Sequence, residues 1–122
     1  MEPPKFSWRA RFRSFSYAFQ GLAWFFKREH NAWIHGMATI LVLLMCFVFK
    51  ISGMEFIVVL FAVALVLIAE IFNTAIEKIM DHLSPSTHPA VKIIKDVAAA
   101  AVLIAAIAAI IAGLIVFIPK IL

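Results

Sequence analysis

Three long runs of mostly apolar residues constrain the fold of this chain more than any other feature. They lie at about 32–51, 54–83 and 96–118, and each reaches the roughly 20 residues that an α-helix needs to cross a bilayer. Little polar sequence surrounds them, because 65% of the 122 residues are hydrophobic and 15% are charged. A soluble domain is roughly half apolar and a quarter charged. The sequence therefore predicts an all-α integral membrane protein with three transmembrane helices, a single domain over 1–122.

The segment at about 8–28 predicts a helix of a different kind. Its apolar residues recur at steps of four and three, which is a strict helical seam, with arginine, serine and glutamine between them. A basic amphipathic helix rich in Phe and Trp is typical of one that lies in the membrane interface. A coiled-coil seam or a nucleic-acid-binding arm is the alternative, but bulky aromatics disfavour a zipper. We therefore expect an interfacial helix and no nucleic-acid partner. The seam consists of Trp8, Phe12, Phe15, Phe19, Leu22 and Phe26.

The lysines and arginines orient the predicted spans. Nine of the 11 basic residues fall on one side of the membrane, and only Lys50 and Lys120 fall on the other. Cytoplasmic segments carry this excess of positive charge, so the N-terminus and the loop at 84–92 are expected in the cytoplasm. The nine are Lys5, Arg9, Arg11, Arg13, Lys27, Arg28, Lys78, Lys92 and Lys95.

A row of polar residues interrupts the second apolar run near its cytoplasmic end. Glu70, Asn73, Glu77 and Asp81 are spaced 3, 4 and 4 apart, which places them on one stripe of a helix. Carboxylates near lipid are unfavourable and mark functional sites. Glu70 lies deepest in the apolar run and is the hardest to explain as a structural residue. Three spans per chain shield such a stripe poorly from lipid, which favours a homo-oligomer.

Further polar residues are expected to gather around this stripe. Glu29 precedes the first span, and His88, Lys95 and Asp96 precede the third. Two carboxylates can hold Mg²⁺, which commonly accompanies nucleotide phosphates. Lys95 and Asp96 are predicted to open the third helix, and a helix N-terminus attracts phosphate. This set suits phosphoryl transfer, although a carboxylate-lined path in an oligomeric ion channel or transport subunit would use the same pattern.

Several of these residues also have a purely structural interpretation. Glu77 and Asp81 could form a solvated helix end, and Asp96 could simply favour a helix N-terminus. His35 and His82 are as compatible with packing at the interface as with a function. From the residues alone, the kinase and the channel therefore stay open as alternatives.

The stripe also belongs to a longer pattern. Residues 70–81 read EIFNTAIEKIMD, which resembles the E-[IL]-x-N-[ST]-A-I-E-x-x-x-D signature of the bacterial diacylglycerol kinase family. Glu29, His88, Lys95 and Asp96 stand at that family's spacings, and the similarity extends from about 15 to 117. These are small lipid kinases of the bacterial inner membrane.

The resemblance implies an ATP- and Mg²⁺-dependent kinase for a membrane lipid alcohol, with active sites between the chains of a homotrimeric helical bundle. Glu70 would be the general base, Glu29 and Glu77 would hold the magnesium of Mg-ATP, and Asn73 and Asp81 would support them. The remaining nucleotide contacts would come from Tyr17, Ser86, Thr87, His88, Lys95 and Asp96.

The chain departs from the family pattern at two positions. Ala10 stands where the family has an arginine that meets the nucleotide, with Arg9 and Arg11 beside it, and Trp33 stands where an arginine is common. The two substrates of the family are diacylglycerol and undecaprenol. The dipeptide at 34–35 and the run at 88–99 look more like the undecaprenol branch, which favours that substrate slightly.

Overall fold

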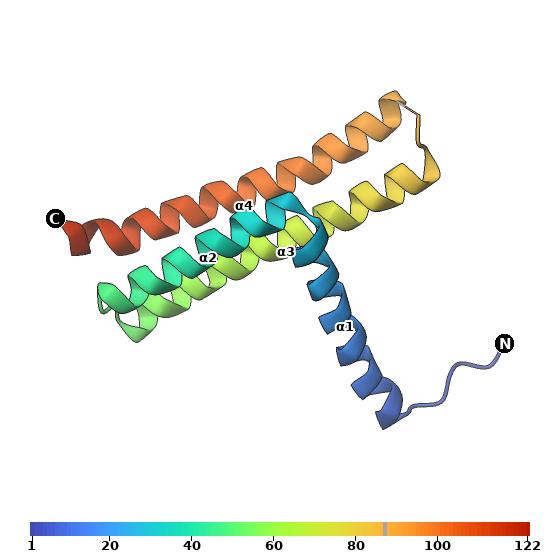
Figure 1. The fold of residues 1–122 in the computed structure, drawn as a ribbon, viewed down its shortest axis with the longest axis horizontal. Coiled ribbons are helices and arrows are strands. Elements are labelled where there is room, and N and C mark those ends of the chain that lie inside the picture. Colours follow the sequence, from blue (N-terminus) through green and yellow to red (C-terminus); the bar gives the residue numbers. More distant parts are fainter. Residues whose placement is uncertain (87) are drawn as a thin grey trace.

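The computed structural model describes residues 1–86 and 88–122 and is helical throughout except for the N-terminal residues and short connections. Helices α2, α3 and α4 run alongside one another as a bundle of alternating direction, and α1 leaves this bundle at a steep angle (Figure 1). The four helices of the described residues are α1 (Trp8–Arg28), α2 (His30–Val48), α3 (Gly53–Leu83) and α4 (Pro89–Ile121).

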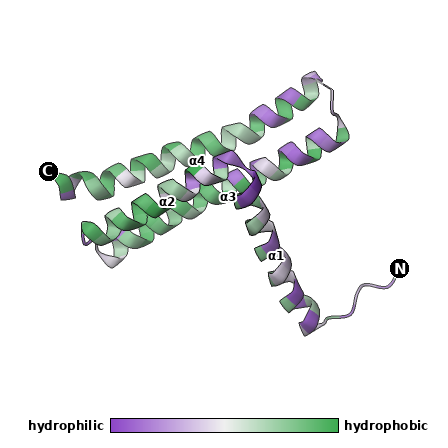
Figure 2. Ribbon diagram, in the orientation of Figure 1, coloured by the Kyte–Doolittle hydropathy of each residue, from purple (hydrophilic) through white to green (hydrophobic). Residues whose placement is uncertain are grey.

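Helices α2, α3 and α4 are each long and apolar enough to cross a membrane. At 1.5 Å per residue, the 31 residues of α3 span about 46 Å, well beyond the roughly 30 Å of a hydrocarbon core. Polar residues concentrate on α1 and on the ends of α3 and α4 that face the loop between them (Figure 2). The predicted all-α architecture with an amphipathic first helix and three candidate spans is confirmed, and the homotrimer remains a prediction.

The turn between α2 and α3 explains why two long helices reverse direction within four residues. The backbone N–H of Ile51 donates to the Cys46 carbonyl at 3.3 Å, and that of Lys50 donates to the Phe47 carbonyl at 3.3 Å. This is a Schellman ending, and it places Lys50 in the left-handed region with φ 50°. Ser52 and Glu55 then cap α3 reciprocally, each side chain accepting from the other's backbone N–H.

The start of α4 differs from the prediction. The helix begins at Pro89, so the prediction that Lys95 and Asp96 open it is wrong. The cause is local: Nδ1 of His88 accepts from the Ala90 backbone N–H at 3.0 Å, and proline at the first helical position has no N–H to satisfy. The chain therefore enters α4 well before the charged pair, which lies in its second turn.

Helix α4 packs mainly against α3. Near the end of the bundle that holds the α2–α3 turn, buried Val59 of α3 clusters with Val116 and Phe117 of α4. The Lys120 ammonium lies 3.1 Å from the Glu55 carboxylate and ties the last turn of α4 to the first turn of α3. These contacts fix the register of α3 against α4, which brings the polar ends of both helices together at the opposite end.

Candidate active site

The deepest polar residues of the stripe are buried within the single chain. Glu70 is 3% exposed, Asn73 7% and Thr74 6%, whereas Asp81, two turns or more beyond them, is exposed. The stripe therefore passes from the bundle interior to the surface along α3. The expectation that other chains would be needed to shield Glu70 is corrected, because the chain's own helices remove it from the surface.

Glu70 has a partner that the sequence pattern did not single out. Nε2 of His35, on α2, lies 3.8 Å from Oε2 of Glu70. His35 is two positions beyond Trp33 at the start of α2. Glu70 comes 35 positions later on another helix, so helical spacing does not link the two residues. Because His35 lies far from the polar stripe in sequence, the sequence alone does not distinguish a packing role from a functional one.

Asn73 and Glu77 form the next level of the stripe. The Asn73 side-chain amide donates to Oε1 of Glu77 at 3.1 Å, as residues four apart on a helix can. The Asn73 carbonyl oxygen Oδ1 is buried and has no partner among the described residues. Since buried acceptors are rarely left unpaired, this oxygen is available to accept a hydrogen bond from a donor such as water.

The junction between α1 and α2 lies beside this level. Glu29 is the single residue between the two helices, and its carboxylate is 3.3 Å from the Lys78 ammonium of α3. The same ammonium lies 5.5 Å from the centre of the Trp24 ring. The Trp33 indole N–H donates to the Phe26 carbonyl and helps to close the junction. Glu29 is thus brought to the turn of α3 that carries Glu77, the neighbour of Lys78 in sequence.

A polar cavity of about 240 Å³ lies where α3 ends and α4 begins. The Lys95 ammonium is 2.5 Å from Oδ1 of Asp81, and the Lys92 ammonium is 2.5 Å from Oδ2 of Asp96. Four predicted nucleotide residues therefore share one cavity with Asp81. Its lining consists of Asp81, Ser84, Pro85, Ser86, His88, Val91, Lys92, Lys95 and Asp96.

Of the predicted nucleotide residues that the structure describes, Tyr17 is not brought to this cavity. Tyr17 is 60% exposed on α1, which projects away from the bundle (Figure 1). Thr87 lies outside the described residues. Arg9 and Arg11, the neighbours of Ala10, are exposed near the far end of the same helix.

The two predicted magnesium ligands fit the chemistry of that ion. Among the described residues, no group of three or more His, Cys, Asp or Glu side chains is close enough to enclose a metal. Mg²⁺ does not require such a cage, because it is commonly held by one or two carboxylates together with substrate phosphates and water. Glu29 and Glu77 supply oxygen donors of this kind; Glu29 contacts Lys78, which follows Glu77 in the sequence.

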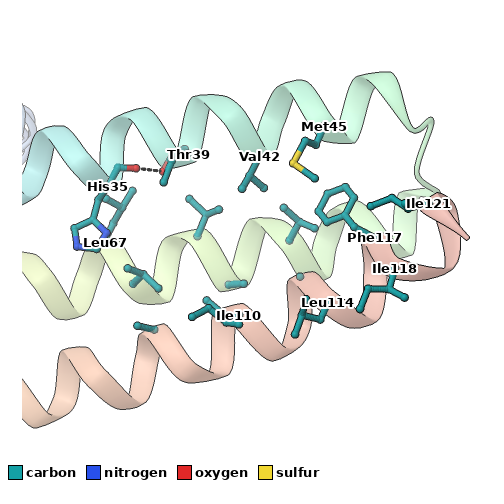
Figure 3. Close-up of a pocket in the computed structure, with 18 residues that line it drawn as sticks. His35, Thr39, Val42, Met45, Leu67, Ile110, Leu114, Phe117, Ile118 and Ile121 are labelled. Atoms are coloured by element: carbon teal, nitrogen blue, oxygen red, sulfur yellow. Dashed lines mark hydrogen bonds between the residues drawn. The ribbon is translucent and has the colours of Figure 1, made fainter.

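An apolar cavity of about 460 Å³ runs along the bundle from His35 to the far end of α4 (Figure 3). Its walls come from all three long helices, and small residues such as Ala38, Ala62 and Gly113 leave it open. His35 lines it at the end that also meets Glu70. The arrangement can therefore accept a long apolar group with a polar head beside a buried carboxylate, on the side of the bundle that leads toward the polar cavity between α3 and α4.

Comparisons with known proteins agree with this chemistry. Residues 16–117 match the family model of prokaryotic diacylglycerol kinase. The chain is 34% identical over 109 residues to an undecaprenol kinase of Bacillus subtilis, with 89% of each chain covered. It is 36% identical over 110 residues to a diacylglycerol kinase of Synechocystis sp., covering 89% of this chain and 63% of that longer relative.

Proposed function

The chain belongs to the prokaryotic diacylglycerol kinase family of lipid kinases, and from this premise we propose that it phosphorylates a membrane lipid alcohol with Mg-ATP at the cytoplasmic face of the bacterial inner membrane. The observation that carries the proposal is the buried Glu70, whose partner His35 lines one end of the apolar cavity. Family membership also leaves the ion-channel alternative without support.

In the proposed reaction the lipid tail occupies the apolar cavity, which places the hydroxyl beside Glu70. The hydroxyl oxygen attacks the γ-phosphorus of ATP in line with the bond to the β-phosphate oxygen, which breaks to release ADP. Glu70 accepts the hydroxyl proton as the new oxygen–phosphorus bond forms. A carboxylate in a water-poor site suits this role, because it acts without competition from solvent.

The nucleotide would bind at the polar cavity between α3 and α4. Lys95 and His88 provide hydrogen-bond donors for phosphate oxygens, and Ser86 and Asp96 line the same space. Glu29 and Glu77 would hold Mg²⁺, which supplies charge neutralisation for the phosphates. The Asp81–Lys95 pair positions the ammonium at the cavity wall, while Asn73 holds the Glu77 carboxylate.

We further propose that the working unit is a homotrimer with sites completed by neighbouring chains. Three features support this proposal: the exposed apolar side chains along the spans, the Oδ1 of Asn73 that has no partner among the described residues, and the exposed Tyr17. A neighbouring chain could bring its α1, with Tyr17, to the nucleotide.

Undecaprenol is the lipid that we favour slightly over diacylglycerol. The dipeptide Ile34-His35 and the run at 88–99 resemble the undecaprenol branch of the family. The relative from B. subtilis is named undecaprenol kinase and matches over 89% of its length. The similar identity to a diacylglycerol kinase makes the choice an experimental one.

The decisive measurement is transfer of labelled γ-phosphate from ATP to each lipid in mixed micelles. The purified protein should phosphorylate at least one of the two lipids, and chelation of divalent cations should abolish the transfer. The ratio of kcat/KM for the two lipids assigns the substrate. A folded protein that transfers phosphate to neither lipid would contradict the proposed function.

A further inference from the structure

The Glu70 carboxylate is 3% exposed, so water does little to stabilise its charge. An ionised carboxylate in such a place requires a partner that donates a hydrogen bond or carries positive charge. Helix α4 offers neither, because the sequence between Val97 and Pro119 contains no titratable residue. Among the described residues, the side chain that pairs with Glu70 is His35 of α2.

His35 is placed to act on both the carboxylate and the lipid cavity. Its ring is 25% exposed and points from α2 toward α3 (Figure 3), with Nε2 at 3.8 Å from Oε2 of Glu70. The hydroxyl of Thr39 donates to the backbone carbonyl of His35 at 2.7 Å. The same ring lines the apolar cavity. The imidazole therefore borders both the buried carboxylate and the apolar cavity.

We propose that His35 is a positioning residue for Glu70. Nε2 faces Oε2 at 3.8 Å, in ion-pair range but beyond a hydrogen bond, and this contact biases the orientation of the carboxylate toward the incoming hydroxyl. No bond to phosphorus is made or broken at His35, and the proton of the lipid hydroxyl goes to Glu70. The inference rests on the proposed function, since it assigns a helper to the base of that reaction.

The pairing itself can be tested without measuring activity. In a double-mutant cycle, His35→Leu leaves Glu70 buried without its partner and should lower the Tm by roughly 5 °C. In the Glu70→Gln background no charge is left to stabilise, so the same His35→Leu change should have little effect. Equal Tm shifts in the two backgrounds would overturn the pairing.

The kinetic test separates positioning from packing. His35→Leu keeps apolar bulk but removes the donor, and we expect kcat to fall about 10- to 100-fold, the factor that corresponds to a buried acceptor without its partner. His35→Gln can still donate and should recover most of kcat. The KM for ATP should not change in either variant, because the nucleotide cavity does not include His35. His82→Leu, on the exposed last turn of α3, is the matched control and should behave as the wild type.

The outcomes distinguish this inference from the proposed function. If the wild-type protein phosphorylates neither lipid, the proposed function fails, and the Tm cycle still decides whether the pair exists. If the wild type is active while His35→Leu keeps full kcat, the positioning role is overturned and the kinase remains. Equal kcat losses in the Leu and Gln variants would also overturn it, because a donor would then make no difference.

Discussion

Glu70 is buried inside the helical bundle, where water hardly reaches it and where a charged carboxylate is disfavoured. Replacing it by glutamine keeps the shape and removes the proton acceptor, so turnover should fall about 10²- to 10⁴-fold. The free energy of unfolding should not fall, because the folded Glu70→Gln variant no longer has to hold a charged group away from water. Labelled-phosphate transfer and thermal unfolding of Glu70→Gln measure the two effects. Glu55→Gln makes the same chemical change at the opposite end of α3 and should leave turnover intact. Normal turnover in Glu70→Gln would remove Glu70 as the base.

At the scale of elements, the turn between α2 and α3 sets how these helices meet. Lys50 adopts φ 50° where glycine has no steric penalty, so Lys50→Gly should stabilise the protein by about 1 kcal/mol. Ser52→Ala removes the cap of α3 and should destabilise it by about 1 kcal/mol. Thermal unfolding measures both shifts. Because this turn lies at the end of the bundle away from Glu70, kcat should be the same in both variants. Destabilisation by Lys50→Gly or stabilisation by Ser52→Ala would show that the turn geometry is different.

At the scale of the whole molecule, the spans expose many large apolar side chains, and a trimer would bury part of this surface. Mixing two inactive variants tests the proposed trimer. Glu70→Gln chains lack the base, and Lys95→Met chains lack a phosphate donor. Suppose that each site takes Glu70 from one chain and Lys95 from its neighbour. When equal amounts of the two variants are unfolded together and refolded, random mixing should then leave about one quarter of the sites with both residues and restore about one quarter of wild-type turnover. Each variant refolded alone serves as the control. Sites built within one chain would show no restoration, and a monomer in cross-linking would exclude the shared site altogether.

The sequence by itself determined the helices and much of the candidate site. Apolar runs of bilayer length predicted three spans, and the seam from Trp8 to Phe26 predicted a separate first helix. The structure confirms the first helix and three helices that are long and apolar enough to cross a membrane. The 3.6-residue period placed Glu70, Asn73 and Glu77 on one stripe. These features depend on spacing along a single helix, which the sequence carries directly.

The tertiary structure decided what depends on contacts between helices. The His35–Glu70 pair, the burial of Glu70 within one chain and the Lys95–Asp81 contact all require the register of one helix against another. That register comes from the Lys50 turn and from packing such as Val59 against Phe117. Even the start of α4 at Pro89 depended on a His88 cap. Sequence spacing does not encode such contacts, because they join residues brought together only when the helices pack.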